Sequence, residues 1–432
     1  MTAVGTDRFV YHRFPISAHR PICPQWGRNP KYQHGWFLPR IGDVDGDGRL
    51  ELCYVKGSGE QVVYDVEGRE RWRWRDQPGR VSGVRVDSNV PLFDFDDRGG
   101  LDLIVPRHRG DRLHLYRIDA ATGDVLACSP RPMDLVPPPA STRINLVPFL
   151  VEPGRWGVLL HQDYAGLTAY DSELRRLWST PLPSLGHTTI PIDIDGDGRE
   201  ELYAGVYLLD ADGQVRWDRR ELLEGTGEDH CDTNPVTCRD HEVELLFGPG
   251  LRSLDPHGRV AWSFEDADLT EVQSIRLLHR PGGDLTLVPT DLPATRRLVW
   301  RGIQMRSLDS ITYFLNAERR VVGRAEGCHI PTQGDFDGDG RDELVLLAPD
   351  LHHLSVLDHA GCELERIPVQ ERVYVSDLRL APLLPELGGE QIVFHEWSED
   401  WTEAHCVLIG NPRADFATRR WDPLASARWT PY

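Results

Sequence analysis

The sequence predicts an all-β protein, a single β-propeller built from four-stranded blades, with eight blades expected and seven as the alternative. Three observations support this fold class. One acidic phrase recurs along the chain, a second phrase recurs with it, and no long amphipathic helical pattern interrupts them. Instead, 32 Pro and 40 Gly separate short apolar runs, which is typical of short strands joined by tight turns.

The acidic phrase reads Asp-x-Asp-Gly-Asp-Gly-x-x-Glu and occurs in full from Asp43, Asp193 and Asp335. Apolar residues flank each copy, so the phrase predicts a loop between two strands. Its carboxylates and one backbone carbonyl are the oxygen ligands that Ca²⁺ prefers. An EF-hand starts in the same way, but its closing Glu comes later and helices flank it.

We therefore predict calcium as the cofactor, with a metal-free acidic turn as the alternative. The expected ligands are the side chains of positions 1, 3, 5 and 9 and the backbone of position 7: Asp43, Asp45, Asp47, Arg49 and Glu51; Asp193, Asp195, Asp197, Arg199 and Glu201; Asp335, Asp337, Asp339, Arg341 and Glu343. A decayed copy starts at Asp94. There, Arg98 takes the third ligand position and is expected to neutralise Asp94 and Asp96 without an ion.

The spacing of the four copies gives the repeat length. Asp43 and Asp94 are 51 residues apart, Asp94 and Asp193 are 99 apart, and Asp193 and Asp335 are 142 apart. These steps fit one, two and three units of the length of a propeller blade. Weaker units that fill the gaps are expected near Arg143, His230 and Gln273 and after Tyr374. Seven blades remain the alternative, because the unit from Gln273 to Gly327 is long and poorly marked.

A second phrase supports the same register. It places an Asp/Gly turn between two apolar runs and a Trp after the turn, as in 64–72, 209–217 and 254–262. We interpret it as the outer hairpin of a blade. The Trp side chains are expected to pack between neighbouring blades.

Composition limits the possible partners. The formal net charge of −20 argues against binding to nucleic acid or to an anionic membrane surface. No apolar run is long enough for a membrane helix, and the N-terminus lacks the apolar core of a signal peptide. We expect a cytoplasmic protein as written, or a secreted one if a signal peptide has been removed. The eight Cys show no Cys-x-x-Cys spacing, so they predict neither a disulfide nor a zinc framework.

A propeller uses the whole length as one closed unit. We therefore expect a single domain over 1–432, with 1–35 and 412–432 as extensions that wrap the ring closure, and a monomer.

The repeated acidic phrase resembles the FG-GAP/VCBS propeller repeats of integrin α-subunit heads and of several polysaccharide lyases. The unit over 193–213, with the Gly/His/Asp-rich stretch 225–232 after it, resembles rhamnogalacturonan lyases of polysaccharide lyase family 11. The chain is also similar to propeller lyases that cut ulvan or rhamnose–glucuronate linkages. The resemblance covers the repeat units and implies a calcium-stabilised enzyme acting on an acidic, rhamnose-containing polysaccharide. Those lyases use His, Tyr and Arg side chains.

A candidate site follows from the register. The acidic loops join the first and second strands, so the opposite face carries the start of each first strand and the end of each second strand. His, Arg and Tyr recur at these positions, and the predicted catalytic residues are His108, Arg143, Tyr164, His187, His230 and His329. These residue types suit β-elimination at a uronate. We expect Arg143 to neutralise the carboxylate. His108, Tyr164 and His187 would share the base and acid roles.

Two other functions remain open. The first is a non-catalytic, calcium-stabilised propeller that binds glycan or protein. The second is a propeller glycoside hydrolase, which needs two facing carboxylates, and Asp163 and Asp232 are the candidates for that pair.

Overall fold

The protein was analysed as a computed structural model. The structure describes residues 8–16, 39–55, 60–74, 84–86, 91–135, 142–225, 231, 235–239, 242–248, 250–264, 269, 272–281, 285–291, 297–300, 303–306, 310–327, 331–350, 352–370, 372–373, 378–397, 404–414, 422 and 424.

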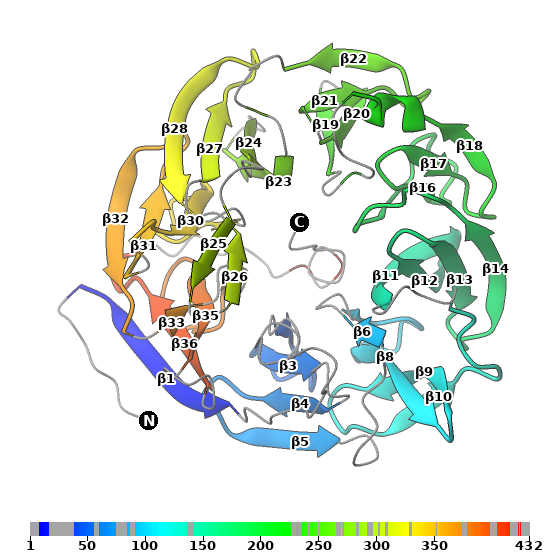
Figure 1. Ribbon diagram of the computed structural model, residues 1–432. Helices are drawn as coiled ribbons and strands as arrows, with labels where there is room; N and C mark the ends of the chain where they lie inside the picture. Colours follow the sequence, from blue (N-terminus) through cyan, green and yellow to red (C-terminus); the bar gives the residue numbers. More distant parts are fainter. Residues whose placement is uncertain are drawn as a thin grey trace.

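Eight four-stranded blades form a ring around a central axis, which confirms the predicted eight-bladed propeller (Figure 1). Within each blade, successive strands pair antiparallel from the axis outwards. The first four blades have these strands: β2 (Arg40–Gly42), β3 (Glu51–Val55), β4 (Gln61–Tyr64) and β5 (Glu70–Trp74); β7 (Leu92–Phe93), β8 (Asp102–Arg109), β9 (Arg112–Asp119) and β10 (Val125–Cys128); β11 (Thr142–Glu152), β12 (Arg155–Gln162), β13 (Gly166–Asp171) and β14 (Arg176–Pro181); β15 (Ile190–Ile192), β16 (Glu201–Tyr203), β17 (Tyr207–Leu209) and β18 (Val215–Asp218).

The other four blades complete the ring: β19 (Val236–Arg239), β20 (Glu242–Phe247), β21 (Arg252–Leu254) and β22 (Val260–Ser263); β23 (Val272–His279), β24 (Leu285–Asp291), β27 (Ser310–Leu315) and β28 (Val321–Gly327); β29 (Thr332–Gly334), β30 (Glu343–Leu347), β31 (His353–Leu357) and β32 (Glu363–Pro368); β33 (Arg372–Val373) and β34 (Arg379–Ala381), then β35 (Gln391–Trp397), β36 (Ala404–Gly410) and β1 (Val10–Ile16). A short 3₁₀ helix, η2 (Arg220–Leu223), follows β18. No helix among the described residues is long and apolar enough to cross a membrane.

The N-terminal strand closes the ring. β1 pairs antiparallel with β36, with Val10 opposite Gly410 and Ile16 opposite Ala404, and so forms the outer strand of the eighth blade (Figure 1). Part of the expected N-terminal extension is therefore a blade strand. Next to it, Phe14 contacts Gly68 in the outer turn of the first blade, which joins the two ends of the ring.

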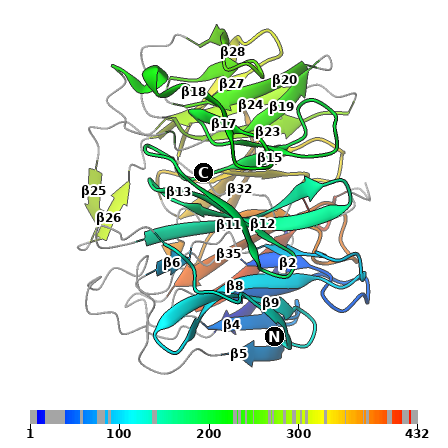
Figure 2. The same cartoon turned by 90° about the vertical axis from the view of Figure 1, so that its right-hand side faces the viewer.

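The sixth blade explains the long, poorly marked unit of the sequence. Between β24 and β27 the chain forms a separate two-stranded hairpin, β25 (Arg297–Trp300) and β26 (Ile303–Arg306). This hairpin stands off one side of the ring (Figure 2). The unit is thus one blade with an insertion. In the third blade, β6 (Val84–Val86) adds an inner strand that runs parallel to β11.

Tryptophans of the outer strands connect neighbouring blades, as the second phrase predicts. Trp72 donates its indole N–H to the carbonyl of Ala120 in the next blade, at 2.8 Å. Trp178 does the same with Ala211, also at 2.8 Å. The ring of Trp178 covers Gly213, which has φ of 78°, and a Cβ there would lie 2.5 Å from the indole. A glycine is therefore required at this turn for both backbone and steric reasons.

Candidate active site and acidic loops

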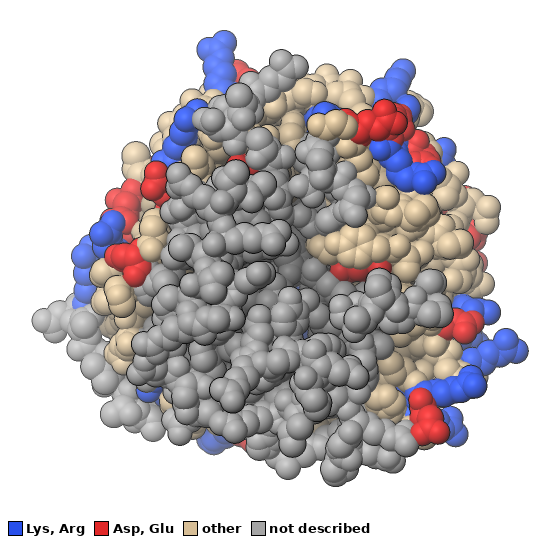
Figure 3. Space-filling view, viewed as in Figure 1, with Lys and Arg blue, Asp and Glu red and all other residues tan. Residues whose placement is uncertain are grey.

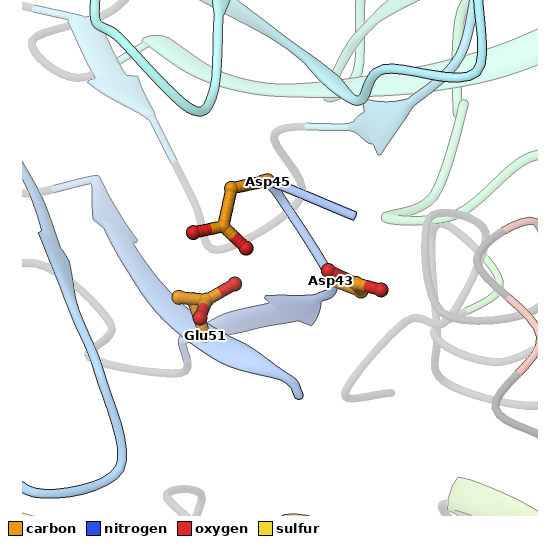
Figure 4. Close-up of side chains that lie close together, drawn as sticks. All are labelled: Asp43, Asp45 and Glu51. Carbon is orange, nitrogen blue, oxygen red and sulfur yellow. The ribbon is translucent and has the colours of Figure 1, made fainter. Parts of the chain in front are cut away.

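The acidic loops bring their carboxylates together. In the first blade, oxygens of Asp43, Asp45 and Glu51 lie within 4.8 Å of one another (Figure 4). The loops of the fourth and seventh blades gather the aspartates of positions 1, 3 and 5 within the same distance: Asp193, Asp195 and Asp197; Asp335, Asp337 and Asp339. Each of these groups can hold a metal ion.

The same backbone hydrogen bonds shape the three loops. The first Asp accepts the N–H of the second loop glycine, at 2.9 Å between Asp43 Oδ2 and Gly48 N. The closing Glu accepts the N–H of position 2, at 3.0 Å from Val44 to Glu51 and at 2.9 Å from Ile194 to Glu201. One oxygen of this Glu therefore fixes the loop. Asp47, Glu201 and Glu343 lie outside the clustered groups. The role of all the predicted residues as calcium ligands stays a prediction.

The chemistry of the seventh-blade loop fits a cation. Asp335 is only 2 % exposed, and its Oδ1 has no hydrogen-bond partner among the described residues. Burial, together with repulsion from Asp337 and Asp335, raises the pKa of Glu343 to about 8. Buried carboxylates that repel one another need a compensating positive charge. A hard cation with oxygen ligands supplies it, and the identification of this cation as calcium stays a prediction.

Arginines supply part of that charge in the first and fourth blades. Arg71 of β5 donates to Asp45 at 2.8 Å and to Glu51 at 3.3 Å. Arg216 of β18 occupies the equivalent position and lies 2.6 Å from Glu201. In the seventh blade the equivalent residue of β32 is Leu364, which is 46 % exposed. The acids of this loop therefore have less built-in compensation.

In the decayed copy in the second blade, arginine side chains supply the positive charge. Arg98 donates to Asp96 and to Asp102, both at 2.6 Å, and Arg117 of β9 donates to Asp96 at 2.8 Å. Asp94 instead accepts the backbone N–H of Gly99, at 2.7 Å. Arg98 thus neutralises Asp96, as the sequence predicts, whereas Asp94 is satisfied by the backbone.

Strand direction places the candidate catalytic residues on the opposite face. β15 is three residues long, and Asp193 follows it directly while His187 precedes it by three positions. Tyr164 lies in the turn between β12 and β13, at the end of a second strand. Both positions are on the face away from the acidic loops, as expected.

The structure brings Asp163, His187 and Tyr164 into one group. His187 Nδ1 lies 2.7 Å from Asp163 Oδ2, and its Nε2 lies 3.5 Å from the hydroxyl oxygen of Tyr164. The two rings meet edge to face, with centroids 5.5 Å apart. Because a carboxylate accepts, Nδ1 carries the proton in this hydrogen bond. In the neutral ring the lone pair of Nε2 then faces the Tyr164 hydroxyl.

The surrounding backbone holds this group in place. Tyr164 has φ of 60°, a strained conformation for a non-glycine residue, and its N–H donates to Leu185 O at 2.9 Å. Asn145 of β11 donates its side-chain N–H to the carbonyl of His187 at 2.6 Å. Tyr164 is 48 % exposed, whereas Asp163 is only 9 % exposed. The carboxylate is therefore sheltered while the phenol is open to a ligand.

His161 contacts the carboxylate of Asp163 from the buried side. It is fully buried, and its Nε2 lies 2.7 Å from Gly186 O and 3.4 Å from Asp163 Oδ1. Since a carbonyl only accepts, Nε2 donates, and Nδ1 accepts from the Thr189 hydroxyl at 2.8 Å. The sequence did not single out His161 or this role for Asp163. His161 lies in β12 and Asp163 directly follows its last residue, so the two-residue alternation of a strand could have indicated that both lie on one side.

Other predicted residues lie elsewhere. His108, at the end of β8, lines a separate cavity over the second blade. Arg143 belongs to β11, where it is paired with Arg85 of β6, but its side chain is outside the described part. His230 and His329 also lie outside the described residues, as does Asp232.

Similarity to known proteins is confined to solved structures. No protein-family model matches the chain, and neither does any curated protein. The exotype rhamnogalacturonan lyase YesX aligns with a TM-score of 0.65 and 17 % identity, over 92 % of this chain and 75 % of that one. The Bacillus licheniformis rhamnogalacturonan lyase PL11 gives 0.62 and 15 %, over 95 % and 77 %. The V. cholerae biofilm matrix protein Bap1 gives 0.59 and 12 %, over 93 % and 91 %. At these identities the likeness establishes the propeller fold.

Proposed function

We propose that this protein is a polysaccharide lyase that cleaves a uronate-containing, rhamnose-containing glycan by β-elimination. The observation that carries the proposal is the contact between His187 and Tyr164, with Asp163 bound to the far nitrogen of the imidazole. The likeness to structures named rhamnogalacturonan lyases supports the substrate class that we propose.

The reaction needs a base and an acid at neighbouring atoms of one sugar. In the proposed step, His187 Nε2 takes the proton at C5 of the uronate, the C4–C5 double bond forms and the C4–O bond breaks. The Tyr164 hydroxyl gives its proton to the leaving oxygen. Proton transfer from His187 to the Tyr164 phenolate then restores both groups, and their separation of 3.5 Å permits it once the product leaves.

Asp163 acts through His187. Its hydrogen bond of 2.7 Å holds the proton on Nδ1, so that Nε2 is free to accept, and its charge stabilises the imidazolium that forms. We assign the neutralisation of the uronate carboxylate to Arg143, which belongs to β11 of the same blade.

The cation of the acidic loops has a structural role in this proposal. Bound calcium would neutralise the clustered carboxylates of the three loops and hold the first and second strands of those blades together. These loops lie at the opposite end of the strands from His187, so the chemistry described above does not involve them.

The glycoside hydrolase alternative loses support, since Asp163 is committed to His187. A non-catalytic glycan-binding propeller remains the rival. Incubation with rhamnogalacturonan, ulvan and a rhamnose–glucuronate gum, followed by ultraviolet absorbance, separates the two. Growth of the unsaturated product supports a lyase. Binding without product on all three substrates would establish the rival.

A further inference from the structure

A polar cavity opens on the face that carries His187, over the second blade. Its volume is about 410 Å³. The tip of the β8–β9 hairpin forms one wall, with His108, Asp111 and Arg112, and the segment 131–135 forms the other, with Arg131 and Asp134. Figure 3 shows charged side chains gathered at the edge of this face over β9 and β10.

Backbone hydrogen bonds make the cavity a fixed feature. Met133 donates its N–H to Leu113 O at 2.8 Å, and Ser129 donates its N–H to Leu115 O at 2.9 Å. The Ser129 hydroxyl donates to Arg131 O at 2.8 Å. The second wall is therefore bound to β9 as an added strand would be, and the two arginines are held on a rigid frame.

Arg112 and Arg131 line the cavity together with two carboxylates, Asp111 and Asp134, so its balance of charge depends on which of these groups have partners. The guanidinium groups of Arg112 and Arg131 make no hydrogen bond or ion pair with the rest of the described structure, and neither does that of Arg109. Arg109 stands directly opposite Arg112 across the hairpin, an arrangement of like charges that destabilises a sheet. Of the acidic lining, Asp134 is already paired with Arg176, at 2.8 Å.

Elsewhere in the described part of this acidic protein, most arginines have carboxylate partners. Arg73, for example, donates to Glu60 at 2.6 Å, and Arg366 donates to Glu363 at 3.0 Å. Two unpaired arginines that line the same cavity suit an external anion. Guanidinium groups recognise carboxylates with two parallel hydrogen bonds, and an overall charge of −20 makes a local basic site necessary for a polyanion.

We infer that Arg112 and Arg131 form a subsite that binds the carboxylate of a second acidic sugar of the glycan. The inference rests on the proposed function for the identity of the glycan. The ion pair between Asp134 and Arg176 joins the rim of this cavity to β14 of the third blade, the blade that carries Tyr164. The β8–β9 hairpin tip and the β12–β13 turn, which carries Tyr164, both follow the second strands of neighbouring blades, so one polysaccharide chain can cross both blades on the same face.

The test measures binding in the absence of turnover. In a His187→Gln background, Arg112→Gln/Arg131→Gln is compared with Arg280→Gln/Arg320→Gln. Arg280 and Arg320 are exposed, have no side-chain partner in the described structure, and lie in turns of the acidic-loop face. The dissociation constants are measured for rhamnogalacturonan, polygalacturonate and their carboxyl-reduced forms.

We expect the cavity variant to bind the acidic polymers at least about tenfold more weakly, as the loss of a charge-assisted contact implies. The control pair should bind like the parent, and the carboxyl-reduced polymers should show no difference. Arg112→Lys/Arg131→Lys should recover part of the affinity, which distinguishes lost charge from misfolding.

Equal affinity of the parent and the cavity variant would overturn the subsite, as would failure of the parent to bind any acidic polymer. The result is independent of catalysis. A protein without lyase activity can still show the carboxylate-dependent loss, and an active lyase with unchanged affinities would refute the subsite alone.

Discussion

The two faces of the propeller are built from the ends of the same strands, yet one face repeats its arrangement of residues and the other does not. On one face, three loops repeat the same aspartates and the same backbone hydrogen bonds. On the other face, Asp163 comes from a turn and His187 from a connection between blades, and no second copy of their arrangement is found among the described residues. Repetition marks the loops that hold the blades together. The hydrogen-bonded arrangement of Asp163 and His187, which is suited to acid–base chemistry, occurs once among the described residues.

The largest effect should come from the face that does not repeat. Tyr164→Phe and His187→Gln should each lower the lyase rate by about 10²–10⁴, the usual contribution of a general acid or base. Their melting temperatures should stay close to that of the parent, because Tyr164 is half exposed and His187 is not fully buried. Initial rates and thermal melting of the same preparations provide the measurement. Full activity in both variants would remove this group from the mechanism.

Removal of the metal should affect the opposite face. A chelator is expected to lower the melting temperature by several degrees, because a ligand at a hundredfold its dissociation constant stabilises by about 2.7 kcal/mol. The lyase rate at low temperature should change little if the fold persists. A melting temperature that does not respond to chelator and calcium would refute the metal sites. A rate that is lost without unfolding would mean that an ion takes part in the chemistry.

A smaller effect should separate two acidic loops of the same face. Asp335→Asn removes a buried, unpartnered carboxylate oxygen, so the calcium-induced rise in melting temperature should shrink by about 1–2 °C. Asp94→Asn lies in the loop that Arg98 and Arg117 already neutralise, and it should leave the calcium response unchanged. An equal loss of the calcium response in both variants would contradict the distinction between the two loops. One would bind a metal ion, and the other is neutralised by arginine side chains.

The smallest effect concerns pH. His359 lies in the outer turn of the seventh blade, on the acidic-loop face, and its Nδ1 is 3.0 Å from the Thr286 hydroxyl. Burial lowers its pKa, and Arg280 and Arg341 add to this effect while Asp342 and Asp358 oppose it. A histidine with a lowered pKa stays neutral in the fold but is protonated in the unfolded chain, so stability falls as the pH drops through about 6.5.

His359→Asn should therefore reduce the loss of melting temperature between neutral and mildly acidic pH by about 1 °C. The variant should leave the pH profile of the lyase rate unchanged, because His359 is on the other face. A shifted rate profile would show that the two faces are coupled.

Much of the fold was predictable because the acidic loop recurs between the first and second strands of several blades. Its recurrence indicates a repeated unit. The phrase from Asp193 gave both the blade length and the position of His187. The β25–β26 hairpin and the added strand β6 were not predicted, since neither repeats in the other blades. The closing role of β1 depends on pairing with β36, a contact between distant residues that no local pattern encodes.

The site was predictable only in part, because contacts between separate segments of the chain are not encoded in a local pattern. Register places His187 and Tyr164 at one face, but the bond from Asp163 to His187 depends on how a turn of the third blade meets the connection to the fourth. Asp163 is hydrogen-bonded to His187, whereas Asp232, its partner in the hydrolytic alternative, lies outside the described residues, so that pairing is not tested. His108 shares the register but lies over another blade, so register alone does not bring it to His187.

The pairing of β1 with β36 has a consequence for the order of folding. Val10 and Gly410 face each other although about 400 residues separate them in the chain. During synthesis, β1 emerges before the first blade and β36 emerges only after seven blades, so the edge of β1 stays without its native neighbour while those blades are made. Closing so long a loop costs chain entropy that only the completed ring repays. A nascent chain that stops before β36 thus contains most of the blades but lacks the β1–β36 pairing that closes the ring.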